Sequence, residues 1–452
     1  MLDRRRLGRA VLAVALAGLA ACQPAAPAAP TPAATPAAAA TLAPGTLYVD
    51  ASRDLGPISP LVYGTNYGPA ISVPFDLKPQ ALAARITYLR FPGGAWGDQN
   101  NLTHLQIDRY IQLAREMGSE PNICARLRGG TPEQAAALVQ YANVEQKYNV
   151  RYWSIGNEPS LYASAKTEDY DTERYNREWR AMAEAMRAVD PTIRLIGPDL
   201  HGAFTANAAT NPKDARGRDW MTEFLKANGD LVDIITVHRY PVYAPTSPVP
   251  ITPATLRENT LEWNQYVIYL RSLIHDISGR DLPVAFTEVN SDPTPGVVGG
   301  SATPDSFYNA IWYADVLGRL IQERVFMVNQ WVFAYRTGGL GLIFGSELRP
   351  TYYVFQMYSH FGSEQVLATS GVKYITVYAS KREDGTLTIM VINLLDTEQT
   401  IPLNVEGVSL SKAKGWLLDA DHKAVEMGEQ SFPTEGKLVL PAQSISLYAL
   451  GK

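Results

Sequence analysis

The segment Arg151-Tyr-Trp-Ser-Ile-Gly-Asn-Glu-Pro159 is a short apolar run that places a glutamate, Glu158, where a β-strand gives way to a loop. A second segment, Leu282-Pro-Val-Ala-Phe-Thr-Glu-Val-Asn290, has the same form and places Glu288 in the same way. Such runs, bounded by turn-forming residues, are typical of buried strands. The two segments therefore predict carboxylates at the C-terminal ends of two strands.

The same pattern of strand, loop and helix repeats along residues 61–333. Helical stretches separate most of the apolar runs, and the stretch 131–148 begins with the start signal Thr131-Pro-Glu. Eight such units predict an α/β fold, a (β/α)8 TIM barrel. A doubly wound open sheet is the competing fold, but Tyr63-Gly-Thr-Asn-Tyr-Gly68 is not followed by a helix that could cradle a phosphate. The expected strands are 61–66, 86–91, 121–127, 151–158, 193–200, 232–240, 282–288 and 325–333.

Beyond residue 362 the hydrophobic period changes from helical to two. Residues 363–452 are therefore predicted to form a C-terminal antiparallel β-sandwich, with a hairpin at Asp384-Gly385. Residues 46–51 are a further strand-like segment that would complete this sheet. The sandwich either packs against the barrel as a structural partner or binds carbohydrate, for which Trp416 is the available aromatic residue.

The first 22 residues have the form of an export signal, in which arginines at positions 4, 5, 6 and 9 precede an apolar run that ends in Leu19-Ala-Ala-Cys22. The pattern resembles a bacterial lipoprotein signal, which implies a signal peptide over 1–22 and lipidation of Cys22. An uncleaved membrane anchor is the alternative. Residues 23–44 are almost entirely Ala, Pro and Thr, as in an extended linker. The barrel is then expected over 45–362, held outside the cytoplasm at the bacterial cell envelope.

Composition argues against several kinds of partner. The formal net charge of −5 offers no basic surface for nucleic acid, so a neutral partner fits better and the membrane is contacted only through the lipid anchor. The six histidines show no metal-ligand spacing, so we expect neither a catalytic metal nor another cofactor. Cys124 lies in an apolar strand run and is expected to be core packing.

In a barrel of this kind, residues at the C-terminal strand ends converge on the active site. Cleavage of a glycosidic bond needs two carboxylates, since one protonates the leaving oxygen while the other attacks the anomeric carbon or activates water. Glu158 and Glu288 are therefore the candidate catalytic residues. Trp331, Tyr67 and Trp96 are candidate stacking platforms for sugar rings, or core residues. The other candidates at strand ends are Asn66, Arg90, Asn157, His238, Tyr240 and Asn290.

Four motifs resemble those of the glycoside hydrolases of clan A, which are retaining barrel enzymes, and the similarity extends to families 44, 51, 39 and 79. The motifs are Gly156-Asn-Glu-Pro159, Phe286-Thr-Glu-Val-Asn290, His238-Arg-Tyr240 and Arg90-Phe-Pro-Gly-Gly94. The resemblance implies that Glu158 is the acid/base and Glu288 the nucleophile of a double displacement. It also implies that Asn157 binds the sugar 2-hydroxyl and that Arg90 and Tyr240 contact the nucleophile. His238 would line the subsite, and a purely structural role for it is an equal alternative.

The two glutamates are expected to differ in protonation. Arg90 should lower the pKa of Glu288, whereas Glu158 faces that charge and a partly apolar wall, which should raise its pKa. The leading expectation is a retaining glycosidase that cleaves cell-wall or extracellular polysaccharides of the β-D-glucan or xylan type. An exo-acting α-L-arabinofuranosidase is the alternative, although Asn66 stands where arabinofuranosidases carry a substrate-binding glutamate. A non-catalytic carbohydrate-binding lipoprotein is a third reading, and it would not need both acids.

Overall fold

A computed structural model describes residues 44–69, 73, 75–162, 170–207, 211–242, 251–408, 412–433 and 435–451. The predicted signal peptide, its lipidation site Cys22 and the linker up to residue 43 lie outside the described residues. Across the part of the chain that is described, no helix is both long enough and apolar enough to span a membrane.

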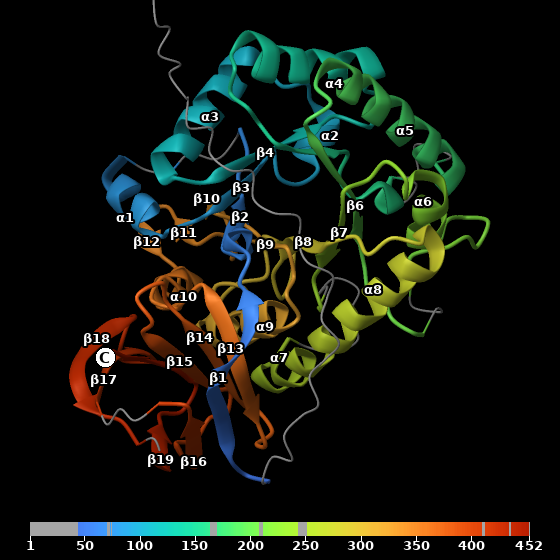
Figure 1. Cartoon of the computed structure of the whole chain (residues 1–452). Coiled ribbons are helices and arrows are strands. Elements are labelled where there is room, and N and C mark those ends of the chain that lie inside the picture. The colour runs from blue at the N-terminus through green and yellow to red at the C-terminus, as the bar shows by residue number, and fades with distance from the viewer. Residues whose placement is uncertain are drawn as a thin grey trace, which may run out of the picture. The chain divides into compact units, whose positions relative to one another are not determined.

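Eight parallel strands close into a barrel in chain order, which confirms the predicted (β/α)8 fold (Figure 1). The first strand is shorter than expected, because residues 60–62 form a 3-10 turn. The strands are β2 (Gly64–Asn66), β3 (Tyr88–Phe91), β4 (Glu120–Ala125), β5 (Tyr152–Ile155), β6 (Arg194–His201), β7 (Ile234–Arg239), β8 (Val284–Val289) and β9 (Met327–Gln330).

Several of the helices begin where the sequence places helix-capping residues. Thr131 and Gln134 form a capping box at the start of α4 (Pro132–Val139), and Asp171 accepts from the Arg174 N–H at the start of α5 (Thr172–Val189). Residues 140–145 continue α4 as a π-helix. The other helices are α1 (Lys78–Ala83), α2 (Trp96–Gln99), α3 (His104–Met117), α6 (Trp220–Asn228), α7 (Pro253–Asn259), α8 (Trp263–Ser278), α9 (Phe307–Gln322) and α10 (Pro350–Tyr358).

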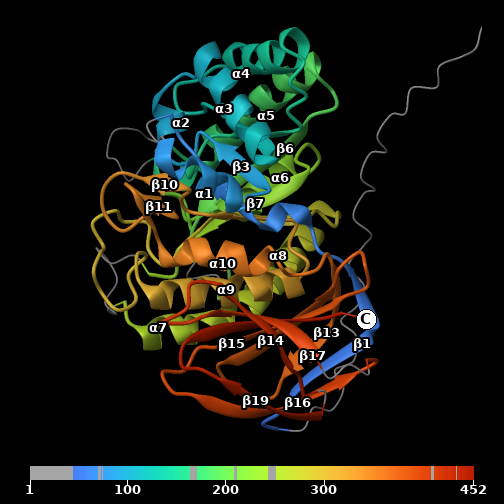
Figure 2. The same ribbon diagram turned by 90° about the vertical axis from the view of Figure 1, so that its left-hand side faces the viewer.

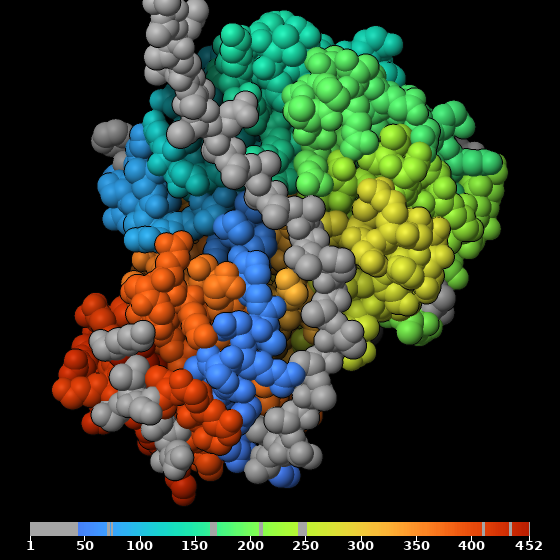
Figure 3. Space-filling view, in the orientation of Figure 1, coloured from blue at the N-terminus to red at the C-terminus, as the bar shows by residue number. Residues whose placement is uncertain are grey.

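A nine-stranded sheet of mostly antiparallel strands follows the barrel, in the order β18-β17-β20-β15-β14-β13-β1-β16-β19. Its strand β1 (Leu47–Pro57) comes from upstream of the barrel, pairing antiparallel with β13 and parallel with β16. Figure 3 shows this blue strand lying against the orange strands. The others are β13 (Glu364–Ser370), β14 (Ile375–Lys381), β15 (Leu387–Asn393), β16 (Gln399–Glu406), β17 (Lys412–Leu418), β18 (Val425–Ser431), β19 (Glu435–Leu440) and β20 (Ser444–Leu450). The short strands β10 (Ala334–Tyr335), β11 (Ile343–Phe344) and β12 (Glu347–Leu348) form a separate small sheet.

Helices α9 and α10 both pack against this sheet (Figure 2). Gly318 of α9 allows close approach, since a Cβ there would lie 2.3 Å from the ring of Tyr378 on β14. The Tyr378 hydroxyl donates to Asp315 Oδ1 at 2.6 Å, and the Tyr308 hydroxyl donates to the carbonyl of Leu394 at 3.0 Å. The interface thus buries polar groups that are paired, as buried polar groups must be to avoid a desolvation cost.

The barrel interior is filled in layers, and the layer nearest the N-terminal strand ends is apolar. We call it the floor, and its residues are Tyr88, Tyr152, Ile196, Ile234, Ala285 and Met327. Side chains of alternate residues in a strand point to the same face. The next inward positions toward the C-terminal ends are polar, such as Arg90 on β3 and Thr236 and His238 on β7, and we call this polar end of the barrel the mouth.

Candidate active site

Glu158 lies three residues beyond the end of the fourth barrel strand, β5, in an unusual backbone conformation. Its φ of 49° and ψ of 53° are left-handed, which is uncommon for a residue with a side chain. The Glu158 N–H donates to the carbonyl of Asp199 at 3.0 Å, which fixes the turn across to the fifth strand. Sparsely populated conformations of this kind persist where surrounding contacts over-determine them.

Glu288 lies within the seventh strand, β8, next to an irregularity in the pairing with β7. Val237 pairs with Phe286, and His238 then pairs with Glu288, so Thr287 is an extra residue. A bulge re-aims the side chains that follow it. Thr287 donates from Oγ1 to Asp199 Oδ1 at 2.5 Å, and Glu288, only 3% exposed, contacts the polar groups of the mouth.

Arg90, on the second strand, is fully buried and contacts four polar side chains. Its Nη1 donates to Glu288 Oε1 at 2.9 Å and to Asn66 Oδ1 at 3.0 Å. Its Nη2 donates to Asn157 Oδ1 at 2.9 Å and to Asp199 Oδ2 at 3.1 Å. A buried guanidinium requires such partners, because an uncompensated charge away from water is costly.

Asn66 lies under this arginine with both ends of its amide engaged. Its Nδ2 donates to the carbonyl of Thr287 at 2.9 Å and of Gln330 at 3.3 Å, while its Oδ1 accepts from Arg90. The residue is completely buried. The structure therefore places Asn66 among the supports of Arg90.

His238 lies in the sixth barrel strand, β7, and Tyr240 lies just beyond its end. His238 contacts both glutamates, and Tyr240 contacts Glu288. The Tyr240 hydroxyl donates to Glu288 Oε2 at 2.6 Å. His238 Nδ1 lies 2.9 Å from Glu158 Oε1 and 3.5 Å from Glu288 Oε2. One oxygen of each glutamate and a nitrogen of His238 lie within 4.8 Å of one another.

Two further residues, neither of them expected from the sequence, contribute to the mouth. Asp199 faces Arg90, and its Oδ1 also lies 3.7 Å from His238 Nε2. His201 Nδ1 lies 3.3 Å from Glu158 Oε1, and its ring stacks on Tyr240 with 6.0 Å between centroids. Both residues lie at the end of a predicted strand, so the rule that selected Glu158 could have found them.

Asp98, in α2 after the second strand, fixes the chain around Asn157. Its Oδ2 accepts from the Asn157 N–H at 2.7 Å and from the Tyr162 hydroxyl, and its Oδ1 accepts from the Leu127 N–H at 3.0 Å. Burial raises the pKa of Asp98, and these hydrogen bonds oppose the rise. The sequence did not predict this role of Asp98, because the residue lies in a short helix and not at the end of a strand.

The predicted aromatic platforms differ in their surroundings. Trp331 is partly exposed, and Gly93 and Gly94 make room for its ring, since a Cβ on Gly94 would lie 2.5 Å from it. Asn290 donates from Nδ2 to the Trp331 carbonyl at 2.6 Å. Tyr67 stacks on Phe91 with centroids 6.2 Å apart, and Trp96 is partly exposed in α2.

The structure reverses the expected order of the pKa values of the two glutamates. Burial raises the pKa of Glu158, but hydrogen bonds from His201 and His238 outweigh burial and lower its pKa to about 2. Burial and the charge of Glu158 raise the pKa of Glu288 against the effects of His238, Arg90 and Tyr240. The expected order of pKa values rested on Arg90 beside Glu288 and on the negative charge and apolar wall that face Glu158, whereas the fold also turns two histidines toward Glu158.

His238 and Asp199 are strongly perturbed as well. Burial lowers the pKa of His238, but Glu288, Asp199 and Glu158 outweigh it and raise that pKa to about 9. Burial raises the pKa of Asp199, and Arg90 and His238 bring it below its usual range. With a pKa of about 9, His238 is protonated in the free protein at neutral pH.

Glu158, His238 and Glu288 are also close enough to hold a divalent cation. Both oxygens of Glu288 already accept hydrogen bonds, one from Arg90 and one from Tyr240. A guanidinium at 2.9 Å would also repel a second positive charge. This donor set fits a proton-transfer site better than a metal site, and the expectation of no catalytic metal stays a prediction.

The chain is similar in sequence and in structure to known glycoside hydrolases. The chain is similar to alpha-L-arabinofuranosidase C of Emericella nidulans, with 23% identity over 417 residues that cover 79% of each protein. It superimposes on an alpha-L-arabinofuranosidase from Thermotoga maritima with a TM-score of 0.73 and 19% identity, covering 90% of this chain and 99% of that one. A Paenibacillus polymyxa xyloglucanase of glycoside hydrolase family 44 gives a TM-score of 0.69 and 15% identity, covering 90% and 99%.

The sequence profile of glycosyl hydrolases family 39 matches residues 139–400, which is more than half of the chain and includes both candidate glutamates. The expected resemblance to clan A glycoside hydrolases is thus confirmed, and with it the assignment of the protein as an O-glycosyl hydrolase. On this evidence the chain belongs to glycosyl hydrolases family 39.

Proposed function

We propose that this glycoside hydrolase retains anomeric configuration, with Glu288 as nucleophile and Glu158 as acid/base. The observation that carries the proposal is that one oxygen of each glutamate lies within 4.8 Å of the other. Retaining enzymes hold their carboxyl groups ~5 to 5.5 Å apart, whereas inverting enzymes need ~6.5 to 9.5 Å to admit a water molecule. The short spacing therefore supports direct attack by a carboxylate.

In the first step, Glu288 attacks the anomeric carbon, the glycosidic C–O bond breaks, and Glu158 gives a proton to the leaving oxygen. In the second step, Glu158 takes a proton from water, and the resulting hydroxide displaces Glu288 from the anomeric carbon. Arg90 and Tyr240 each hold one oxygen of Glu288, which fixes the carboxylate plane for attack. Such preorganised donors also stabilise the carboxylate when it leaves.

The proton for Glu158 comes from His238 in this proposal. His238 carries it in the free protein, and its Nδ1 lies 2.9 Å from Glu158 Oε1. Transfer of this proton to Glu158 makes the acid competent as the leaving oxygen develops charge. Removal of water by the substrate favours the transfer, because it replaces an ion pair by two neutral groups.

Asn157 is suited to bind a sugar hydroxyl. Its Oδ1 accepts from Arg90, and its backbone N–H donates to Asp98. These two bonds hold the side chain and the backbone of Asn157 in place. Within the described residues its Nδ2 has no partner, which leaves two donors for a substrate next to Glu158. Trp331, partly exposed at the end of the eighth strand, is the stacking surface we propose for the ring.

Two substrate classes have support. The relatives of this chain include arabinofuranosidases from fungi and from Halalkalibacterium halodurans, which favours α-L-arabinofuranosides. The second class is the β-D-glucans or xylans, and two observations favour it. Asn66 is buried and fully bonded, so it cannot replace the substrate-binding glutamate of arabinofuranosidases. A similar structure also belongs to a bifunctional glucanase-xylanase, with a TM-score of 0.70.

A panel of 4-nitrophenyl α-L-arabinofuranoside, β-D-xylopyranoside and β-D-glucopyranoside tests the proposal. Proton NMR identifies which anomer of the sugar is released first. We expect hydrolysis of at least one substrate with retention of configuration. A first product of inverted configuration would contradict the double displacement, and the preferred glycoside decides between the two substrate classes.

We also propose that the enzyme works on glycans outside the cytoplasm, attached to the bacterial envelope through Cys22. The support is the sequence of residues 1–22 alone. Metabolic labelling with a palmitate analogue should tag the wild-type chain and not Cys22→Ser. Equal labelling of both would contradict the anchor.

A further inference from the structure

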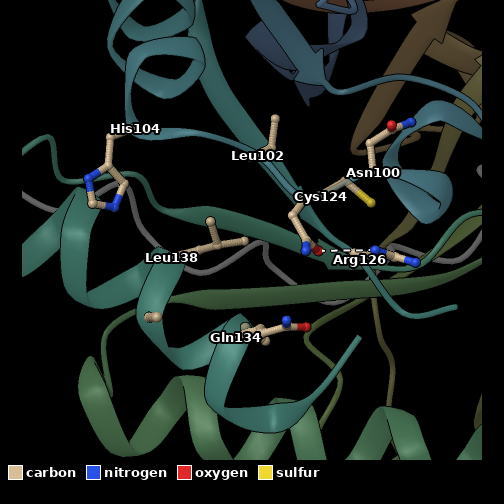
Figure 4. Close-up of a pocket in the computed structure, with 10 residues that line it drawn as sticks. Asn100, Leu102, His104, Cys124, Arg126, Gln134 and Leu138 are labelled. Carbon is tan, nitrogen blue, oxygen red and sulfur yellow. Dashed lines mark hydrogen bonds between the residues drawn. The ribbon is translucent and has the colours of Figure 1, made fainter. Parts of the chain in front are cut away.

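A cavity of about 250 Å³ lies on the mouth side of the barrel, at the C-terminal end of the third strand, β4 (Figure 4). Its walls come from the segment between α2 and α3, from the end of β4 and the residues after it, and from α4. Pockets for drug-sized ligands measure roughly 300–1,000 Å³. This cavity therefore suits one small ring rather than an extended chain.

Arg126 is the fixed charge in this cavity. Its Nε donates to the carbonyl of Arg128 at 2.8 Å, and its Nη1 donates to Asn101 Oδ1 at 3.3 Å. No residue that lines the cavity is acidic, and among the described residues Arg126 has no ion-pair partner. A guanidinium has five N–H donors, so these two bonds leave most of its donors for a ligand.

A glycine, Gly129, lies beside this guanidinium. A Cβ on Gly129 would lie 3.3 Å from Arg126 Nη2, and the φ of +70° there also disfavours other residues. An arginine in a concave site without an acid is an electropositive point within a protein of net charge −5. Such a point favours a ligand with a carboxylate, which matches the fork of the guanidinium.

The remaining lining residues fit a sugar ring. Gln134 accepts at Oε1 from the Thr131 N–H at 3.1 Å, and Asn100 donates from Nδ2 to the Trp96 carbonyl at 3.1 Å. These bonds leave the Gln134 amide N–H₂ and the Asn100 carbonyl oxygen for hydroxyl groups. Leu102 and Leu138 supply apolar wall, which suits the C–H faces of a pyranose.

The cavity is joined to the catalytic centre through the chain that follows β4. The N–H groups of Leu127 and Arg128 donate to Asp98 Oδ1, and the other oxygen of Asp98 accepts from Asn157. Cys124, which also lines the cavity, donates from Sγ to the Gly156 carbonyl at 3.2 Å. A ring bound here would therefore lie one strand away from Glu158.

We propose that this cavity is a subsite for a uronic acid unit of the glycan, whose carboxylate pairs with Arg126. The proposal rests on the glycosidase function above and adds to it a preference for acidic glycans. The hydrolysed sugar occupies the centre between Glu158 and Glu288, and the uronic acid occupies a separate position. The neutral partner expected from net charge is thereby refined to a glycan that carries occasional carboxylates.

Isothermal titration of the full chain with sodium D-glucuronate, D-glucose and inorganic phosphate tests the subsite without requiring turnover. We expect glucuronate to bind, and Arg126→Met to weaken binding roughly 10- to 100-fold, the range for a lost charged hydrogen bond. Arg109→Met is the matched control, because Arg109 is exposed on α3. Leu138→Trp fills the cavity without altering Arg126 and should also abolish binding.

Equal affinity of wild type and Arg126→Met for glucuronate would overturn the proposal. Glucose bound as tightly as glucuronate would overturn the role of the carboxylate, and phosphate bound as tightly would overturn the assignment to a sugar. Failure of the proposed glycosidase function appears in the aryl glycoside panel. The titration measures binding without turnover, so failure of the glycosidase function and failure of the uronic acid subsite give different results.

Discussion

The floor and the mouth of the barrel are built by the same strands and stabilised in opposite ways. On β3 the floor residue Tyr88 is followed two positions later by Arg90, and on β7 Ile234 is followed by Thr236 and His238. The floor gains stability by removing apolar surface from water. The mouth instead buries charged side chains, and each of them needs its partner because an unpaired buried charge destabilises the fold. The comparison shows that a step of two residues along one strand separates the apolar floor, which stabilises the fold, from the polar mouth, which holds the candidate catalytic groups.

Glu288→Ala should have the largest effect and act on the mouth alone. We expect kcat to fall on the order of 10⁴-fold or more, because the covalent intermediate cannot form. Added azide should restore cleavage of activated aryl glycosides with inverted products. Glu184→Ala, on the exposed face of α5, is the control. Rescued products of retained configuration would contradict the role of Glu288.

Glu158→Ala should reduce the rate by about 10²- to 10⁴-fold for poor leaving groups, the usual contribution of general acid catalysis. The loss should be much smaller in the first step for a dinitrophenyl glycoside, which needs no acid. A 2-fluoro glycoside inactivator, followed by peptide mass spectrometry, should still label Glu288. Labelling of Glu158 in the wild-type enzyme would mean that the two roles are exchanged.

Ile234→Ala tests the floor. The side chain is 1% exposed, and its truncation leaves a cavity in the barrel, so the free energy of unfolding should fall by about 2 to 5 kcal/mol. We expect kcat of the folded enzyme to be unchanged, with urea unfolding as the measurement. Ile268→Ala removes the same atoms at a position that is 46% exposed and should have little effect. A loss of kcat in Ile234→Ala without lost stability would break the distinction between floor and mouth.

The pH profile gives the smallest effect. His238 has a pKa of about 9, raised mainly by Glu288 and Asp199 against burial, so it keeps its proton below that pH and loses it above. We expect kcat/KM to fall about tenfold per unit above pH 9, because the proton needed by Glu158 is then lost. His238→Gln should shift this limb. An unchanged limb in a folded His238→Gln variant would place the proton elsewhere.

Much of the fold was predictable from local pattern. The eight apolar runs with helices between them are enough to predict the barrel, because strand and helix periods are properties of neighbouring residues. Thr131 and Asp171 mark their helices by local capping chemistry. The strand-end rule also found Glu158 and Glu288, since the C-terminal ends of parallel strands share one edge whatever the sequence between them.

By itself, then, the sequence determined the barrel, the glycosidase class and the two glutamates at its mouth. Only the tertiary structure decided how those glutamates are tuned. The bulge at Thr287 turns Glu288 inward, and Asp199 and His201 enter the cluster from a strand that carried no motif. Alternation and propensity act over a few residues, whereas pKa values depend on distances of a few ångströms between groups far apart in the chain. Those distances exist only once the barrel has closed.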